Sequence, residues 1–478
     1  MKSRILKSIV AITAFATLPM SLEISAQNVQ SGTSRIHYAV INLGTLGGTE
    51  SNGFGGVNNR GWVTGDANLA GDQNEHAVLW RDGVITDLGT LGGPNSSVPM
   101  PVKDDRGFVV GVAQIAEVDP LGEFWGATFV CTPSVSCQGW QNLLRGFVWK
   151  NGVMTALPTL GGNNSGALGV NNRGQIVGGA ETANQDPNCV PPQVLDIQAV
   201  VWGPNPAQIK VLPVFPGDPV AVALAINDLG QAVGSSGPCQ GPTSGFALRH
   251  AVLWQHDTVT DLGSLGGVMS NAANAINNEG QVVGQSDLPG DTATHAFFWQ
   301  NGVMTDLGTL QGDSNSIAYN INDKAQVVGI SCDVNFNCRP FLWENGVMTD
   351  LNTLIPPNSP LYLTFGAGIN DRGEIAGSAC VLSNGVCTSE VPAFLAIPCG
   401  QSDTTNEECQ DAVEGRSGAS IRPAAVLSQN MREQLRLHRG FGRFGSRPRG
   451  QQRSKGIDLD RWVIGSMRTN GTFPSHSA

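Results

Sequence analysis

One short motif recurs along most of the chain and constrains its fold more than any other feature. It consists of Asn-Asx-x-Gly, or a close variant, followed by three mostly apolar residues and a further Gly. A repeat of roughly 45–50 residues indicates a propeller or a solenoid rather than a single compact core. The seven copies are Asn58–Gly65, Asp104–Gly111, Asn171–Gly178, Asn227–Gly234, Asn277–Gly284, Asn322–Gly329 and Asn370–Gly377.

The clearest repeat unit, residues 274–312, predicts four short strands. They are expected at 275–277, 281–283, 296–299 and 303–307, where β-branched and aromatic residues are frequent. Asn278-Glu-Gly280 and Asn301-Gly302 are typical turn sequences, because Asn and Gly tolerate positive φ. Four strands per unit of this length predict a β-propeller blade, and the units lack the apolar stripe of a helix-pair repeat.

The two ends of the repeat region predict a closed ring of seven blades. The last copy is followed by a third strand, 393–397, but not by a fourth, whereas 41–48 near the N-terminus resembles the fourth strand 305–312. We expect residues 37–48 to pair with 393–397 and complete blade seven, which would remove exposed strand edges. The predicted fold is therefore an all-β, seven-bladed β-propeller of four-stranded blades, closed by its N-terminal strand.

The sequence His295-Ala-Phe, followed by Trp-x-Asn-Gly-Val-Met-Thr-Asp-Leu-Gly-Thr-Leu, resembles the HAF-type repeats of bacterial extracellular proteins. The resemblance covers roughly residues 37–398, and His76-Ala-Val and His250-Ala-Val are near copies of the triplet. It implies a secreted bacterial repeat protein, and it transfers no reaction, catalytic residue or cofactor. Other residues stand at or near the His position in four blades: Arg145, Gln198, Arg339 and Pro392.

The N-terminal segment predicts export. Residues 1–26 begin with Lys2, Arg4 and Lys7 and continue with an apolar run over 9–20, as a secretory signal does. That run is too short for a bilayer, which needs about 20 residues, although an uncleaved anchor is the alternative. Residues 27–36 read as a linker. The mature protein is expected to be extracellular or periplasmic, without a transmembrane segment.

The ten cysteines predict disulfides, because close pairs in the loops of an exported protein usually form them. Cys189 and Cys239 lie in the same loop of neighbouring blades and are expected to link them, although spacing alone does not fix this pair. No pair has the Cys-x-x-Cys spacing of a zinc or redox site. The other expected pairs are Cys131–Cys137, Cys332–Cys338, Cys380–Cys387 and Cys399–Cys409.

Most of the length variation lies in the loops between second and third strands, at 112–145, 179–197 and 235–249. We call the face that carries them the loop face, and the opposite face, which carries only tight turns, the turn face. Ligand binding is expected on the loop face; neutral drift of loop length is the alternative. A ring of polar residues near the channel mouth is a candidate ligand site, although turn chemistry also explains it. Its members are Ser51, Ser96, Ser165, Ser270 and Asn315.

No sequence feature points to catalysis. Residues that recur in several blades, such as the Thr-Asp pairs, the Trp and the His, indicate structural roles. The chain lacks a Gly-x-Ser-x-Gly elbow, a His-Glu-x-x-His pair and a phosphate loop, so no catalytic residue, metal site or cofactor is predicted. Glu117, Asp119 and Glu123 near Trp125 and Trp140 could bind a saccharide or a metal, but we interpret them as a solvated loop.

The predicted function is therefore a non-enzymatic binding or scaffold role toward an unknown extracellular polymer or protein. The alternative is a polysaccharide-active hydrolase or lyase, and a third possibility is a cation-stabilised structural ring. A monomer is expected, and nucleic acid is not an expected partner.

Residues 399–478 lie outside the repeat and differ from it in charge. The full chain carries a net charge of −11. From Asp411 onward, 12 Lys and Arg stand against 5 Asp and Glu, which gives +7 and leaves −18 for the remainder. A short helix is predicted at 424–438, and 440–455 is expected to be disordered. This tail could dock on the acidic ring, bind an anionic surface or act as a spacer.

Overall fold

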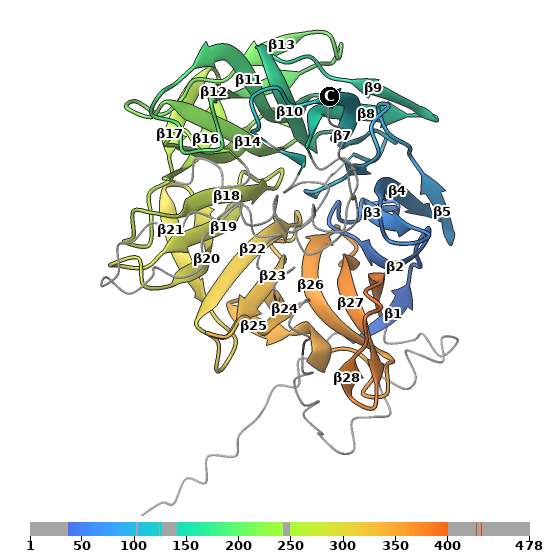
Figure 1. The fold of residues 1–478 in the computed structure, drawn as a ribbon. Coiled ribbons are helices and arrows are strands. Elements are labelled where there is room, and N and C mark those ends of the chain that lie inside the picture. Colours follow the sequence, from blue (N-terminus) through green and yellow to red (C-terminus); the bar gives the residue numbers. More distant parts are fainter. Residues whose placement is uncertain are drawn as a thin grey trace, which may run out of the picture. The chain divides into compact units, whose positions relative to one another are not determined.

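The computed structural model describes residues 37–101, 104–123, 125–126, 141–241 and 249–399, together with residues 427 and 432. Seven antiparallel sheets stand in a ring, and each contains four consecutively paired strands (Figure 1). The predicted seven-bladed β-propeller is confirmed. The predicted signal sequence, the linker and nearly all of the tail lie outside the described residues. No helix among the residues described is long and apolar enough to cross a membrane.

The blades follow one another along the chain, each running from its inner to its outer strand. Blade one contains β2 (Gly47–Asn52), β3 (Val63–Leu69), β4 (Glu75–Arg81) and β5 (Val84–Asp87). Blade two contains β6 (Ser96–Ser97), β7 (Val109–Val118), β8 (Asn142–Lys150) and β9 (Val153–Ala156). Blade three contains β10 (Gly161–Val170), β11 (Ile176–Gln185), β12 (Leu195–Trp202) and β13 (Ile209–Val211). Blade four contains β14 (Val220–Ile226), β15 (Ala232–Gly237), β16 (His250–Gln255) and β17 (Thr258–Asp261).

The remaining three blades complete the ring. Blade five contains β18 (Asn271–Ile276), β19 (Val282–Asp287), β20 (Thr294–Gln300) and β21 (Val303–Gly308). Blade six contains β22 (Asn315–Ile321), β23 (Val327–Cys332), β24 (Cys338–Glu344) and β25 (Val347–Asp350), and the short 3-10 helix η2 (Leu351–Thr353) follows it. Blade seven contains β26 (Leu361–Ile369), β27 (Ile375–Ser383), β28 (Val386–Cys387), β29 (Ala393–Pro398) and β1 (Tyr38–Asn42).

The last Gly of each motif is required by a close approach between the first two strands of the blade. A Cβ on Gly65 would lie 1.8 Å from the main-chain oxygen of Asn52, and one on Gly284 would lie 2.0 Å from that of Ala272. Both distances are shorter than any real Cβ contact, so only Gly fits. In blade five the same strand pair shifts register near this point, between Ala273 and Ala275.

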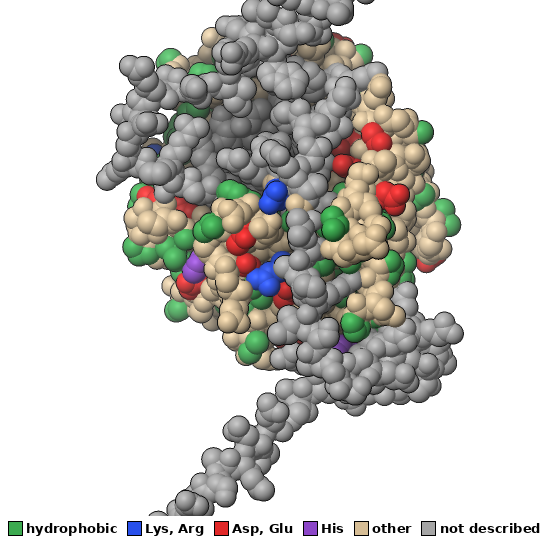
Figure 2. Space-filling model, turned by 60° about the horizontal axis from the view of Figure 1, so that its bottom comes forward, with side chains coloured by type: hydrophobic (Ala, Val, Ile, Leu, Met, Phe, Trp, Pro, Cys, Tyr) green, Lys and Arg blue, Asp and Glu red, His purple; other side chains and the backbone are tan. Residues whose placement is uncertain are grey.

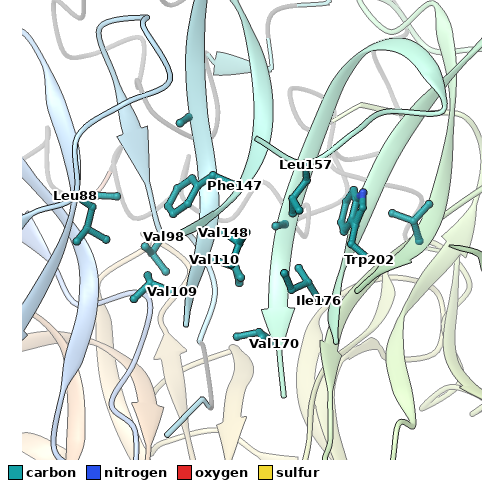
Figure 3. Close-up of a cluster of buried hydrophobic side chains, with 14 of the residues drawn as sticks. Leu88, Val98, Val109, Val110, Phe147, Val148, Leu157, Val170, Ile176 and Trp202 are labelled. Atoms are coloured by element: carbon teal, nitrogen blue, oxygen red, sulfur yellow. The ribbon is translucent and has the colours of Figure 1, made fainter. Parts of the chain in front are cut away.

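The core consists of apolar clusters between neighbouring blades rather than one central core. Figure 3 shows one such cluster, in which Leu88, Phe147 and Trp202 come from blades one, two and three. Trp202 is fully buried, and its indole N–H donates to the main-chain oxygen of Pro158 at 3.0 Å. The recurrent Trp therefore packs between blades here, as the sequence predicts, and the N–H avoids the cost of burial without a partner.

Blade seven contains strands from both ends of the ring. β1 pairs antiparallel with β29, from Tyr38 opposite Pro398 to Asn42 opposite Phe394. The pairing is shorter than the predicted 37–48, because Gly47 already belongs to β2 of the next blade. Closure of the ring by this pairing stays a prediction.

All seven described cysteines form disulfides. The predicted bonds Cys189–Cys239, Cys332–Cys338 and Cys380–Cys387 are confirmed. Cys399 is also disulfide-bonded. Cys131, Cys137 and Cys409 lie outside the described residues. These bonds favour an oxidising environment over the cytoplasm.

Candidate functional site

The turn face carries a closed ring of side chains from the second residue of each motif, which we call the Asx ring. The main-chain N–H of each member donates to the side-chain Oδ1 of the member in the next blade. All seven distances are 2.8–2.9 Å, and the bond from Asp371 to Asn59 closes the circle. The members are Asn59, Asp105, Asn172, Asp228, Asn278, Asp323 and Asp371.

A second circle, which we call the Asn belt, lies beside it and uses the first residue of each motif. Six Asn side chains donate from Nδ2 to the main-chain oxygen of the first motif residue in the next blade, at 2.8–3.0 Å. These bonds satisfy buried polar groups where blades meet. The six are Asn58, Asn171, Asn227, Asn277, Asn322 and Asn370.

Asp104 interrupts the Asn belt in blade two. Its carboxyl has no N–H to donate toward Asn171, and its Oδ2 is buried without a hydrogen-bond partner among the described residues. Its Oδ1 still accepts from the main-chain N–H groups of Arg106 and Phe108 at 2.8 and 2.7 Å. Burial raises the pKa of Asp104, and these bonds lower it only in part.

The two circles surround a small cavity of about 40 Å³ on the axis of the ring, because all seven blades contribute to its lining. The apolar residues that precede the motif, such as Val57 and Ile276, also line it. A cavity of this size holds a few water molecules. The Asp oxygens Oδ1 already accept main-chain N–H groups, so the arrangement needs no cation to satisfy them. The sequence interpretation missed this site, although the restriction of the second motif position to Asn and Asp is its signal.

The loop face is built differently, and its main feature is a network of buried acids between blades two and three. Glu123 is fully buried, and its Oε1 accepts from the main-chain N–H groups of Val194 and Leu195 at 2.9 and 2.7 Å. Gln193 donates from Nε2 to Glu123 and to Glu181, both at 2.9 Å. The side chain of Asn164 joins the same network and donates to Asp119 at 3.1 Å.

The network corrects the interpretation of Asp119 and Glu123 as parts of a solvated loop. Asp119 and Trp125 are also buried, and Trp125 donates its indole N–H to Gln193 at 3.0 Å. The partners come from blade three, which sequence reasoning about the blade-two loop alone did not include. Glu117 is exposed as expected, and Trp140 lies outside the described residues.

Two carboxyls meet inside this network. The carboxyls of Glu123 and Glu181 share the donor Gln193 and influence each other's charge, and the Oε2 of Glu123 has no hydrogen-bond partner among the described residues. Burial, together with the nearby charge of Glu123, raises the pKa of Glu181 to about 9. The pair therefore holds a proton at neutral pH. Because both groups are fully buried, they stabilise the loop rather than reach a substrate.

Covalent and main-chain bonds extend the linkage to blade four. The Cys189–Cys239 disulfide joins the loops of blades three and four, and Val190 donates its N–H to the main-chain oxygen of Cys239 at 2.8 Å. Among the described residues, one group of potential metal ligands converges, formed by these two cysteines with Asp186 and Asp196. Both sulfur atoms are in the disulfide, so they are not available to a metal.

The predicted ring of polar ligands lies between blades. Ser51, Ser96 and Ser165 are buried, and each accepts a main-chain N–H from the third strand of the preceding blade, at 2.8–3.1 Å. In blade six Ser316 makes this bond, whereas Asn315 accepts from Thr294. Ser270 accepts from Gln285 at 3.0 Å. These bonds join neighbouring parts of the chain, and ligand binding by these residues stays a prediction.

In blades one and five the His of the repeated triplet links the third and fourth strands of its blade, whereas His250 in blade four instead pairs with Asp218, which precedes β14. Nδ1 of His76 lies 2.9 Å from Asp87, and Nδ1 of His295 lies 2.9 Å from Asp306. In blade six Arg339 takes the place of the His and forms an ion pair with Asp350 at 3.1 Å. A structural link of this kind explains why the residue recurs in several blades better than a catalytic role does.

In the view of Figure 2, acidic, basic and apolar side chains are interspersed on the described surface.

Neither a protein-family model nor a curated protein sequence matches the chain. Among solved structures, it is similar to Pyrococcus horikoshii acylaminoacyl peptidase, with a TM-score of 0.41, 9% identity, and coverage of 72% of this chain and 51% of the peptidase. Oligogalacturonate lyase from Vibrio parahaemolyticus gives a TM-score of 0.37 and 9% identity, and the match covers 76% of this chain and 96% of the lyase. Trypanosoma rangeli sialidase gives a TM-score of 0.35 and 10% identity, and the match covers 76% of this chain and 56% of the sialidase. The chain thus spans about half the length of the peptidase and of the sialidase, and the low scores assign no activity to it.

Proposed function

We propose that this protein is a secreted, non-enzymatic binding or scaffold module. It recognises an extracellular polymer or protein through the loop face of blades two to four. One observation carries the proposal: the described parts of the long loops of these three blades are joined to one another by the buried acid network and by the Cys189–Cys239 disulfide. Loops held in place in this way lose little conformational entropy when they bind a partner.

The acids of the loop face support binding rather than catalysis. Glycoside hydrolysis requires two carboxyls that reach the substrate, separated by roughly 5–10 Å. Glu123 and Glu181 share the donor Gln193 and are fully buried. The HAF-type resemblance supports export, which fractionation of the producing cells would test directly.

A binding screen of the mature protein against a glycan array and extracellular matrix proteins tests the proposal. A double variant, Cys189→Ser with Cys239→Ser, should weaken binding because it releases the loops of blades three and four. Asn301→Ala in a hairpin of the turn face serves as the matched control and should leave affinity unchanged. Equal binding by both variants would contradict the proposal. Turnover of a polysaccharide that a single acidic substitution abolishes would favour the alternative, a polysaccharide-active hydrolase or lyase.

A further inference from the structure

An aromatic cluster lies where blades six, seven and one meet. Phe365 of β26 packs against Phe54 and against Tyr319 of β22, and both pairs of ring centroids are 4.7 Å apart. Tyr362 and the disulfide-closed loops Cys332–Cys338 and Cys380–Cys387 belong to the same apolar cluster. The cluster therefore reaches the loop face, where the loops between second and third strands lie.

A residue far outside the repeat occupies this cluster. Leu427 is 2% exposed and belongs to the same buried apolar cluster. Arg432, five positions later, lies beside the same region, with Nη1 3.5 Å from Oδ1 of Asn337 in the loop between β23 and β24. Leu427 and Arg432 themselves thus lie against blades six and seven.

The short loops of these blades explain why the cluster is available. The disulfides close loops whose cysteines are only 6 and 7 positions apart, so little chain remains to cover the apolar ends of the blades. Blades two to four, in contrast, carry long loops of their own. An apolar surface left open in this way would be a site for association.

Charge also favours the chain's own tail as the occupant. The residues from Asp411 onward carry +7, and the remainder of the chain carries −18. Opposite net charges favour association of the tail with the propeller, and salt should weaken this contribution.

We propose that the aromatic cluster is a docking site for the C-terminal tail of the chain, which it holds through Leu427. Insertion of Leu427 holds the segment in place, and the positive charge of the tail assists its docking. The site lies on blades six and seven, away from the loops of blades two to four. Docking of the tail at this site is therefore independent of the proposed binding function.

The test uses the full chain and a synthetic peptide of residues 420–438. Leu427→Asp should release the segment, because a carboxylate is not stable in an apolar cluster. The Leu427→Asp protein should then bind the added peptide at least about tenfold more tightly than the wild-type protein, whose site is occupied. Binding measured by titration calorimetry should weaken as salt rises. A peptide that itself carries Leu427→Asp should not bind.

Two controls keep the result interpretable. Leu229→Asp changes a Leu that is 66% exposed in a turn, and this protein should not gain peptide binding. Hydrogen exchange should rise in β22 and β26 of the Leu427→Asp protein while the other blades stay protected. Leu427→Ala should change peptide binding and hydrogen exchange in the same direction, but by a smaller amount. Equal peptide affinity for wild type and both Leu427 variants, all folded, would overturn the proposal.

Discussion

The turn face and the loop face of this propeller are stabilised in opposite ways. On the turn face, the second motif residue of every blade bonds to the next blade and closes the Asx ring, and the first motif residue does so in six of the seven blades. On the loop face, residues that occur once each, such as Glu123 and Gln193, join blades two and three. The repeated motif therefore builds the uniform turn face, while residues that occur only once build the loop face, on which partner binding is proposed.

The largest expected effect concerns how the ring closes, because two separate sets of contacts join blade seven to blade one. The Asx ring and the Asn belt cross this junction through Asp371 and Asn370. β1 adds a strand to blade seven on its own. Deletion of residues 37–42 should expose the edge of β29 and cause aggregation or loss of cooperative unfolding, as followed by circular dichroism. An unchanged melting transition would show that the turn-face bonds alone suffice.

The cross-blade disulfide should matter more than a local one. Its cysteines are 50 positions apart, and the loop-entropy relation gives about 4 kcal/mol of unfolding free energy for Cys189→Ser with Cys239→Ser. The matched control, Cys332→Ser with Cys338→Ser, removes a bond that closes a separation of 6, for which the same relation gives about 2 kcal/mol. Denaturant unfolding measures both. Equal losses would contradict the special linkage of blades three and four.

The buried acids make stability depend on pH in a defined direction. The pKa of Glu181 rises from its ordinary 4.5 to about 9 on folding, so the folded protein binds the extra proton. This contribution to stability is complete below pH 4.5 and is lost as pH rises toward 9. Glu123→Gln should make the free energy of unfolding depend less steeply on pH. The reason is that the new amide N–H can donate to the carboxylate of Glu181, whereas the oxygen of Glu123 cannot when it is ionised. A gain of roughly 2 kcal/mol at pH 8 is expected.

Glu117→Gln is the control for this measurement, since Glu117 is exposed on the same strand-loop segment. It should leave the pH profile of unfolding unchanged. A Glu123→Gln profile identical to that of the wild type would mean that the two carboxyls do not share a proton.

The smallest effect is expected from a substitution that completes the Asn belt. Asp104→Asn supplies the missing N–H and should donate to the main-chain oxygen of Asn171, with a gain of about 1 kcal/mol. The reverse change, Asn277→Asp, removes a donor that now bonds at 3.0 Å and should cost a similar amount or more. Thermal unfolding of the two variants compares them. Destabilisation by Asp104→Asn would contradict this account of the belt.

The sequence predicted the elements that repeat. The seven copies of the motif, the Asn-Gly hairpins and the third strands ending in Trp were sufficient for the blade count, because each copy carries the same local turn chemistry. The tight pairing behind the last Gly, as at Gly65, was not visible, since it depends on a carbonyl from the preceding strand.

The candidate sites were harder to predict, because their residues are distant in sequence. Asn172 bonds to a residue 56 positions later, and Gln193 to one 70 positions earlier. Turn propensity explains Asn in the motif equally well without such partners. The short pairing of β1 also departs from expectation: Leu43 still donates its N–H to the main-chain oxygen of Ala393, but residues 44–46 connect to β2, which begins at Gly47.

The Asx ring has an odd number of members, and this has a consequence for its charges. Asn and Asp alternate from Asn59 to Asp323, so that an amide donor can serve each carboxylate. Strict alternation cannot close over seven positions, and Asp323 and Asp371 are left as adjacent like charges. Asn59 compensates on the other side of Asp371, to which its amide donates at 2.7 Å. Because the number of positions is odd, one pair of like neighbours is unavoidable, and here it is a pair of carboxylates at the junction of blades six and seven. An even-numbered ring with the same two residue types could alternate without such a defect.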